Sequence, residues 1–267
     1  MYPSHWGLRE SPFRNCLDPR FFYQSPTHDE ALARMHFLIE QRRRLGVLLG
    51  VSGSGKSMLL EVFAEQLRRL GTPAARISLQ GVTPDEFLGQ LATAFQLNPG
   101  PDDSRASLWR AIIDRLSEYR YQQVGTAILL DEADTANVEV LSQVSRLAAF
   151  DLSAQSGLTI LLAARPESLK HLGSRLLELA ELRIDVEPWQ QSDTEDYLST
   201  SLAQAGRETP VFDGSAVSRL HELSHGIPRR VSRLADLSLL AGAGAELDEI
   251  GAEVVESVYD ELGLIEV

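Results

Sequence analysis

Cysteine, lysine and long hydrophobic runs are all scarce in this chain of 267 residues. A single cysteine, Cys16, cannot form an internal disulfide, which excludes a disulfide-stapled secreted scaffold and indicates a reducing compartment. The longest apolar run, around Leu158–Ala164, has the length of a strand and is shorter than the ~18 residues that span a bilayer. The first seven residues lack the basic and apolar regions of a secretory signal. We therefore expect a cytoplasmic chain with no membrane insertion of its own.

The charge of the chain is one-sided. A formal net charge of −13 argues against a protein that coats nucleic acid or anionic membrane through bulk charge, although it allows a local basic patch. Of the 25 cationic residues only two are lysines, Lys56 and Lys170. Lys56 lies in a glycine-rich loop, which draws attention to that loop. Otherwise, 43% hydrophobic and 24% charged residues are typical of a globular protein.

Apolar segments of strand length alternate with segments of helical periodicity up to Pro188. The predicted strands are Leu45–Gly50, Ala75–Leu79, Thr126–Leu130, Leu158–Ala164 and Leu182–Val186. The predicted helices are His28–Arg44, Lys56–Leu70, Pro84–Phe95, Ser104–Tyr121, Val138–Phe150 and Pro166–Leu179. This alternation predicts an α/β fold with a parallel sheet and helices on both of its faces.

After Pro188 the strand signals end. Four further helices are predicted, over Asp193–Ala205, Asp213–His225, Pro228–Leu240 and Asp248–Leu262. We therefore expect two domains, an α/β core over residues 1–188 and an all-helical domain over residues 189–267.

The glycine-rich loop has the P-loop pattern Gly50-x-x-x-x-Gly55-Lys56-Ser57, between a predicted strand and a predicted helix. Glycines allow successive backbone N–H groups to turn toward phosphate oxygens, and the following helix directs its positive end at them. The lysine ammonium reaches the β- and γ-phosphates, and the serine hydroxyl is a ligand for Mg²⁺. The expected nucleotide-binding residues are Gly50, Val51, Ser52, Gly53, Ser54, Gly55, Lys56, Ser57 and Met58.

A second acidic element supports nucleotide hydrolysis. Four apolar residues, 127–130, lead to Asp131 and Glu132 at the end of a predicted strand. We expect Ser57 and Asp131 to be the metal site for Mg²⁺, and Glu132 to activate a water molecule. The adjacent glutamate is typical of ATPases with an αβα sandwich of sheet order 5-1-4-3-2, in which a strand lies between the P-loop strand and this acidic strand.

The chain resembles the AAA+ ATPases of the general secretion pathway protein A type (ExeA type) along nearly its whole length. The specific matches are the N-terminal block with Trp6-Gly7-Leu8 and Pro12-Phe13, the segment Asp18–Tyr23, and the segment Ser224-His-Gly-Ile-Pro-Arg-Arg230. The P-loop and the Asp131-Glu132 pair are shared with many ATPases. The resemblance implies ATP with Mg²⁺ as cofactors and a C-terminal helical lid.

The resemblance also implies roles for residues outside these motifs. Arg229 corresponds to a sensor arginine of the lid, with Pro228 beside the nucleotide. Arg183 and Arg175 are alternative arginine fingers, and Arg165 stands where the family has a polar sensor residue within Gly-Gln-Pro-Glu. Pro12, Phe13 and Ala31 are candidates for an adenine pocket, with ordinary packing as the alternative. The change to Arg165 leads us to expect slow or partner-stimulated ATP turnover.

The expected function is that of an ATP-hydrolysing switch or assembly motor for a protein complex, related to secretion or the cell envelope. The expected partners are further copies of the chain, in a ring or arc, and an unidentified protein that could hold it at the inner membrane. Members of that family continue into a membrane helix, and we expect this chain to lack that anchor. The alternatives are a DNA-engaged AAA+ regulator of the transposition or origin-recognition type, with nucleic-acid binding not favoured, and a non-hydrolysing adaptor gated by nucleotide.

Two weaker signals are given structural explanations. His221 and His225 have the helical spacing of metal ligands, but no third ligand is evident and we expect no metal there. Arg42, Arg43 and Arg44 fall at a predicted helix C-terminus, where cations suit the helix dipole, although a nucleic-acid patch is the alternative.

Overall fold

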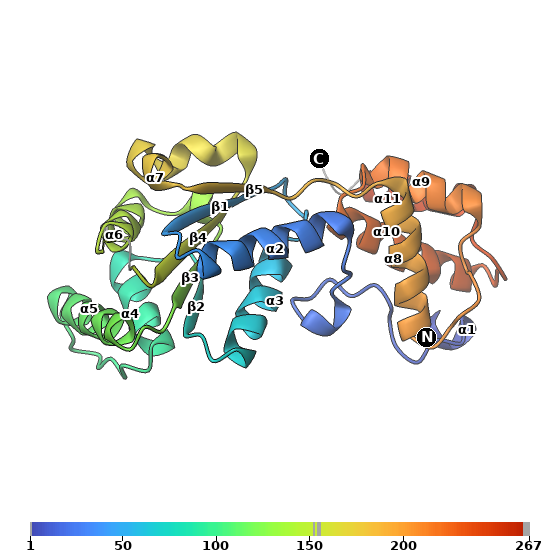
Figure 1. Cartoon of the computed structure of the whole chain (residues 1–267). Helices are drawn as coiled ribbons and strands as arrows, with labels where there is room; N and C mark the ends of the chain where they lie inside the picture. Colours follow the sequence, from blue (N-terminus) through green and yellow to red (C-terminus); the bar gives the residue numbers. More distant parts are fainter. Residues whose placement is uncertain (1, 152, 154–155, 264–267) are drawn as a thin grey trace. The chain divides into compact units, whose positions relative to one another are not determined.

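Figure 1 shows the computed structural model of the chain, which describes residues 2–151, 153 and 156–263. The chain divides into two compact units. One, here called the sheet unit, contains His28–Ser52 and Lys56–Val186; the other, the helical unit, contains Met1–Thr27, Gly53–Gly55 and Glu187–Val267. The division near residue 187 lies close to the expected domain boundary. It differs from the expectation at the N-terminus, because the first 27 residues pack with the helical unit.

The sheet unit is built on five parallel strands. They are β1 (Leu45–Leu49), β2 (Ala74–Ser78), β3 (Thr126–Asp131), β4 (Leu158–Ala164) and β5 (Leu182–Asp185), in the spatial order β2-β3-β4-β1-β5. This confirms the predicted α/β fold and the order 5-1-4-3-2. Strands β1, β3 and β4 are buried along their whole length, which explains why they are continuously apolar.

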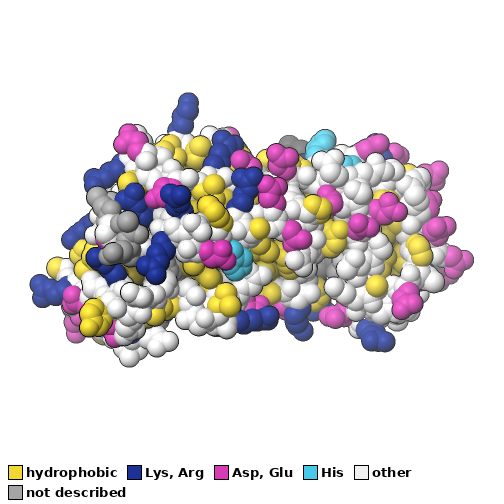
Figure 2. Space-filling view, viewed as in Figure 1, with side chains coloured by type: hydrophobic (Ala, Val, Ile, Leu, Met, Phe, Trp, Pro, Cys, Tyr) yellow, Lys and Arg dark blue, Asp and Glu magenta, His cyan; other side chains and the backbone are white. Residues whose placement is uncertain are grey.

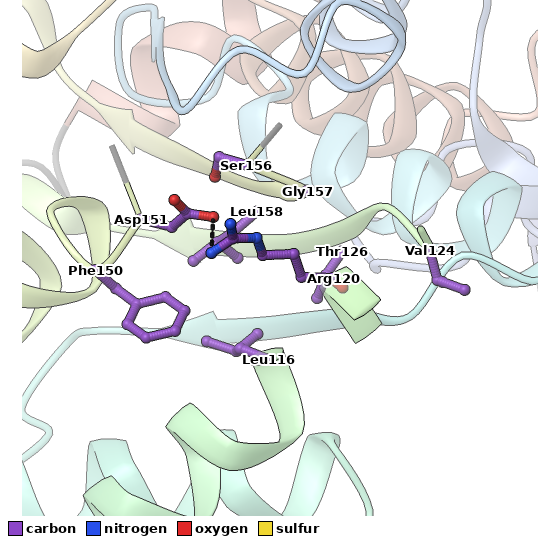
Figure 3. Close-up of a pocket in the computed structure, with 9 residues that line it drawn as sticks. All are labelled: Leu116, Arg120, Val124, Thr126, Phe150, Asp151, Ser156, Gly157 and Leu158. Carbon is purple, nitrogen blue, oxygen red and sulfur yellow. Dashed lines mark ion pairs between the residues drawn. The ribbon is translucent and has the colours of Figure 1, made fainter. Parts of the chain in front are cut away.

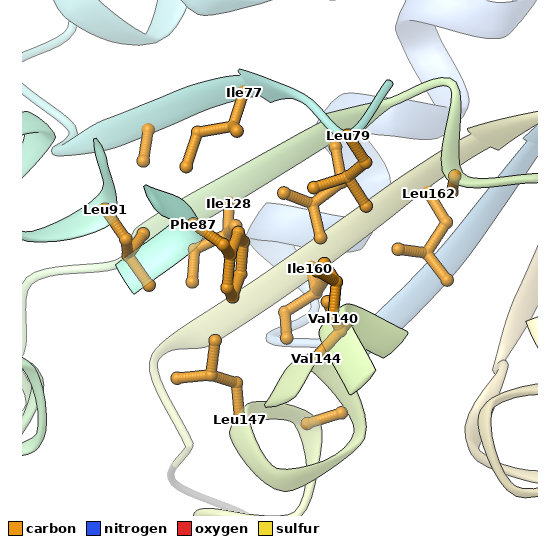
Figure 4. Close-up of a cluster of buried hydrophobic side chains, with 14 of the residues drawn as sticks. Ile77, Leu79, Phe87, Leu91, Ile128, Val140, Val144, Leu147, Ile160 and Leu162 are labelled. Atoms are coloured by element: carbon orange, nitrogen blue, oxygen red, sulfur yellow. The ribbon is translucent and has the colours of Figure 1, made fainter. Parts of the chain in front are cut away.

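Helices cover both faces of the sheet. They are α2 (Pro26–Glu40), α3 (Lys56–Arg69), α4 (Pro84–Ala94), α5 (Arg105–Tyr121), α6 (Val138–Ala148) and α7 (Ser174–Leu179), with short 3₁₀ segments at Ala133–Thr135 and Pro166–Leu172. On one face, Phe87 of α4 and Val140 of α6 pack against Ile128 and Ile160 of the central strands (Figure 4). On the other face, Gly46 of β1 admits the side chain of Leu38 from α2, since a Cβ at Gly46 would lie 2.4 Å from Leu38 Cδ1.

In the helical unit, the helix predicted over Pro228–Leu240 continues to Gly244, and the helix predicted over Asp248–Leu262 begins at Ala252. Two predicted helices of the sheet unit also differ from the observed ones. The first stops at Glu40 rather than Arg44, because Arg42 adopts a left-handed conformation with φ of +51° and Arg43 N–H closes the end on Leu38 O. The segment 166–179 is a 3₁₀ turn and a short α-helix, separated by Gly173 with φ of +80°. Arg42, Arg43 and Arg44 therefore lie in the connection between α2 and β1.

The helical unit contains α1 (Tyr2–His5), a 3₁₀ turn at Pro19–Phe21, α8 (Gln191–Gln204), α9 (Gly214–Ser224), α10 (Pro228–Gly244) and α11 (Ala252–Gly263). The N-terminal segment contributes to its core. Trp6 is 1% exposed, and its indole Nε1 donates to Leu239 O at 2.8 Å. Tyr2 is hydrogen-bonded to Asp236, and burial raises the pKa of Tyr2 to about 12. No helix of the described part of the chain is both long and apolar enough to cross a membrane.

Replacement of Trp6 by alanine tests whether the N-terminal segment stabilises the helical unit. Loss of a buried aromatic side chain is expected to lower the free energy of unfolding by ~3–5 kcal/mol. Urea unfolding of the full chain, followed by circular dichroism, measures the change. Leu17→Ala is the control in the same segment, because Leu17 is 51% exposed and its truncation should change stability by less than ~0.5 kcal/mol. Equal effects of the two substitutions would contradict the packing described.

Candidate nucleotide site

The P-loop leaves the carboxyl end of β1 and enters α3. Gly53 and Gly55 have φ of +86° and +99°, backbone conformations that residues other than glycine rarely adopt. Helix α3 begins at Lys56, so its positive N-terminal end follows the loop directly. This local structure follows from the glycines and from the apolar strand before them, and it is the arrangement that binds phosphate through backbone N–H groups.

Lys56 lies against its own loop. Its ammonium Nζ donates to Gly50 O at 2.6 Å and to Val51 O at 3.0 Å. Two backbone carbonyls thereby hold the charge at the loop that is expected to bind phosphate. The role of this lysine toward phosphate stays a prediction.

Asp131 and Glu132 lie at the carboxyl end of β3 and have different surroundings. Asp131 is 4% exposed, and its Oδ1 accepts the backbone N–H of Glu132 at 3.0 Å. Glu132 is left-handed, with φ of 54° and ψ of 36°, and is only partly buried. Its Oε2 accepts a hydrogen bond from the Ser78 hydroxyl at 2.7 Å.

Sequence analysis missed Ser78, which ends β2 and pairs in register with Asp131. The predicted strand order contained the signal, because it makes the second strand the neighbour of the acidic strand. A polar residue at the end of that neighbour is therefore expected to lie beside Glu132.

Arg76 was also missed. It lies two residues before Ser78 on β2, with its side chain 25% exposed. Its guanidinium Nη1 lies 3.1 Å from Glu61 Oε2 of α3, and its Nη2 lies 3.7 Å from Asp131 Oδ2. Arg76 therefore links the helix that follows the P-loop to the acidic strand.

Arg165, the residue at the expected sensor position, follows β4 and forms an ion pair with Asp134. Arg165 Nε donates to Asp134 Oδ2 at 2.6 Å, and the Asp134 side chain is only 4% exposed. This bond holds the pKa of Arg165 above its ordinary value. Asp134 lies in the 3₁₀ turn directly after Glu132, so the ion pair joins this turn to the residue that follows β4. A sensor role for Arg165 toward nucleotide stays a prediction.

The two candidate arginine fingers differ in their surroundings. Arg183 on β5 pairs with Asp185, with Nη2 2.7 Å from Oδ1, and both side chains are exposed. Arg175 is exposed in the first turn of α7 and has no ion pair with any residue that the structure describes. An arginine-finger role for either residue stays a prediction.

The remaining predicted site residues are distributed over the two units. In the helical unit, Arg229 follows Pro228 at the start of α10, and its backbone N–H donates to Gly53 O at 3.2 Å. Pro12 and Phe13 are buried there, with the Phe13 ring 5.7 Å from that of Tyr197. Ala31 is buried on α2. Their roles toward a nucleotide stay predictions.

The chemistry of the donor set fits Mg²⁺. A serine hydroxyl and a carboxylate, Ser57 and Asp131, are hard oxygen ligands, and Mg²⁺ is commonly held by one or two carboxylates together with substrate phosphates. Among the described residues, no group of three or more His, Cys, Asp and Glu side chains is arranged to hold a metal. His221 instead makes a 2.9 Å hydrogen bond with Thr194 through Nδ1.

A small cavity lies at the opposite end of the sheet (Figure 3). It lies beside Thr126 and Leu158, the first residues of β3 and β4, and beside an ion pair of 3.1 Å between Arg120 and Asp151. Ligands of open parallel sheets bind beyond the carboxyl ends of the strands, where the P-loop and Glu132 lie. This cavity is therefore separate from the candidate nucleotide site.

Comparisons with known proteins agree with this fold. The family model described as AAA domain matches residues 39–172, half of the chain. The general secretion pathway protein A of Aeromonas hydrophila is 29% identical over 245 residues, which are 90% of this chain and 45% of that protein. The chain thus spans about half the length of this relative.

Solved structures show the same fold at low sequence identity. The Aeropyrum pernix ORC1 protein, solved in complex with DNA, superposes with a TM-score of 0.69 at 19% identity, covering 96% of this chain and 69% of that one. The Cdc6p of Pyrobaculum aerophilum superposes with a TM-score of 0.70 at 17% identity, covering 92% and 70%. With the family model matched over half of its length, the chain belongs to the AAA domain family, within the AAA+ P-loop ATPase fold.

Proposed function

We propose that the chain binds ATP with Mg²⁺, hydrolyses it, and acts as a switch or assembly motor for a protein complex. The observation that carries the proposal is the placement of Glu132, which is held by the Ser78 hydroxyl beside the buried Asp131. This carboxylate lies at the edge of the sheet from which the P-loop also leaves.

Each residue of the site has a distinct part in the proposed reaction. The loop amides and Lys56 bind the phosphates, and Ser57 and Asp131 hold Mg²⁺, which neutralises phosphate charge when bound. Glu132 orients a water molecule and accepts its proton. Ser78 donates a hydrogen bond to Glu132, which fixes the direction of the carboxylate.

Charge favours a protein partner over nucleic acid. The helical unit contains 18 acidic and 8 basic residues, so it carries −10 of the net −13. Figure 2 shows acidic side chains spread over the part of the surface formed by this unit. A phosphate backbone would be repelled there. Of the candidates for a basic patch, Arg42, Arg43 and Arg44, the last two pair with Glu181.

The secretion-related role rests on the name of the relative in Aeromonas hydrophila. In this proposal the chain is cytoplasmic and is held at the inner membrane by a partner. The DNA-engaged alternative is supported by the fold of the ORC1 protein, whose structure contains DNA. Binding of a duplex by this chain, measured by fluorescence anisotropy at 50 and 200 mM salt, would favour that alternative.

Lys56→Ala is expected to abolish ATP binding without unfolding the chain, because Lys56 contacts loop carbonyls rather than the core. Mg-ATP at about 100 times its Kd should stabilise the wild type by ~2.7 kcal/mol, which shifts Tm by several degrees. Thermal unfolding with and without Mg-ATP measures this shift. Lys170→Ala is the matched control, since Lys170 is the other lysine and is exposed. An equal shift in Lys56→Ala and the wild type would refute the nucleotide site.

Glu132→Gln is expected to retain ATP binding and lose hydrolysis, because an amide cannot accept the proton of the attacking water. Single-turnover hydrolysis of ATP measures the effect, with Glu139→Gln, an exposed glutamate of α6, as the control. Hydrolysis at the wild-type rate in Glu132→Gln would assign the base to another group. If the wild type binds ATP without hydrolysing it, the nucleotide-gated adaptor is the better description.

If neighbouring copies of the chain share each nucleotide site, two variants that lack different parts of the site should complement one another. Arg183→Ala would remove a finger and Glu132→Gln would remove a base, so a mixed interface regains one complete site. An arginine supplied in trans can accelerate phosphoryl transfer by ~10³–10⁵. We expect ATPase activity per chain to rise with protein concentration, and activity to return in part when the two variants are mixed. Arg175→Ala tests the alternative finger, and Arg34→Ala, an exposed arginine of α2, is the control. If neither variant is complemented and light scattering shows a monomer, the trans-acting finger is wrong.

A further inference from the structure

Arg76 is a cation that lies between two carboxylates, one of which, Asp131, is an expected magnesium ligand. It lies on the same face of β2 as Ser78, because alternate residues of a strand point to one side. Residues Arg76 and Ser78 therefore approach the acidic strand together. Ser78 contacts Glu132, and Arg76 faces Asp131.

The second carboxylate comes from the helix that follows the P-loop. Glu61 is four residues after Ser57 on α3, so the two side chains lie on one face of the helix. Arg76 Nη1 contacts Glu61 Oε2 at 3.1 Å and Arg76 Nη2 lies 3.7 Å from Asp131 Oδ2. The guanidinium thus lies between two acids, one of which, Glu61, is one helical turn from the expected serine ligand of the metal.

Without this cation the same residues would resemble a divalent-cation site. The Glu61 and Asp131 carboxylates would both flank the position that the guanidinium now occupies, and their repulsion would be relieved by a metal ion. Carboxylate and hydroxyl oxygens are the ligands that Mg²⁺ and Mn²⁺ prefer. A positive charge within about 4 Å of a carboxylate opposes the approach of a second cation to that carboxylate.

We propose that Arg76 is a positioning residue that prevents Asp131 and Glu61 from holding a divalent cation by themselves. Its charge balances these carboxylates when nucleotide is absent. The other oxygen of Asp131, Oδ1, accepts a hydrogen bond from the backbone N–H of Glu132. Mg²⁺ then binds only together with phosphate oxygens, so metal and nucleotide enter the site as one unit. The proposal rests on the proposed function in one respect, the role of Asp131 as a ligand of Mg²⁺, but its main test needs no nucleotide.

The test is titration of the nucleotide-free full chain with Mn²⁺, in which electron paramagnetic resonance measures the free ion. Arg76→Gln is expected to bind Mn²⁺ at least ~10-fold more tightly than the wild type, because the opposing charge is gone. Arg76→Lys retains the charge and should bind as weakly as the wild type. The double variant Arg76→Gln with Glu61→Gln should lose the gain. Arg69→Gln, which removes an exposed arginine of α3, is the matched control.

Wild-type affinity for Mn²⁺ in a folded Arg76→Gln variant would overturn the proposal, and so would tight Mn²⁺ binding by the wild type without nucleotide. Tm in the presence of EDTA establishes that each variant is folded. If Arg76→Gln does not fold, Glu61→Gln decides. In Glu61→Gln one of the two acids is neutral, so the charge of Arg76 acts on Asp131 alone. The Mg²⁺ concentration that half-saturates nucleotide binding should therefore rise ~3-fold or more. An unchanged concentration refutes the proposal, whereas failure of the wild type to bind any nucleotide refutes the proposed function instead.

Discussion

The parallel arrangement of the five strands is the constraint on which the candidate site depends. Because all strands run in one direction, every strand ends at the same edge of the sheet. Residues from four separate stretches, near 50–57, 78, 131–134 and 165, are thereby gathered at that edge. Antiparallel pairing of any of these strands would place its final residues at the opposite edge. The chemistry is thus assembled by topology, and the buried apolar strands fix that topology through the hydrophobic effect.

The same edge carries two acidic side chains that are almost fully buried, and each has an arginine beside it. Asp131 faces Arg76 and Asp134 is bonded to Arg165. A buried carboxylate without a partner is costly, so these arginines are required wherever the acids are required. A planar guanidinium can contact two groups at once, as Arg76 does with Asp131 and Glu61, whereas a lysine ammonium is a single point charge. Removal of either arginine would leave a buried carboxylate without that charged partner.

The sequence was sufficient to predict the strands, their order and the two phosphate-site motifs, because these depend on continuous patterns. Runs such as 127–130 are apolar over their whole length, and the P-loop has a fixed spacing of glycines and lysine. Ser78, Arg76 and Asp134 are single polar residues without a motif, and their function depends on which strand lies beside which. The N-terminal segment was harder still. Its burial in the helical unit depends on Trp6 meeting Leu239 and Phe13 meeting Tyr197, residues about 180 or more positions away, and no local pattern encodes such contacts.

The two units differ in net charge. The sheet unit is nearly balanced, with 20 acidic and 17 basic residues, and many of its arginines are paired with nearby carboxylates. The helical unit carries most of the excess negative charge, and its Arg219 pairs with both Glu222 and Glu256. A surface of this kind repels phosphate backbones and attracts basic protein segments at a rate that falls as salt is added. The net charge therefore opposes nucleic-acid binding more strongly at the helical unit than at the sheet unit.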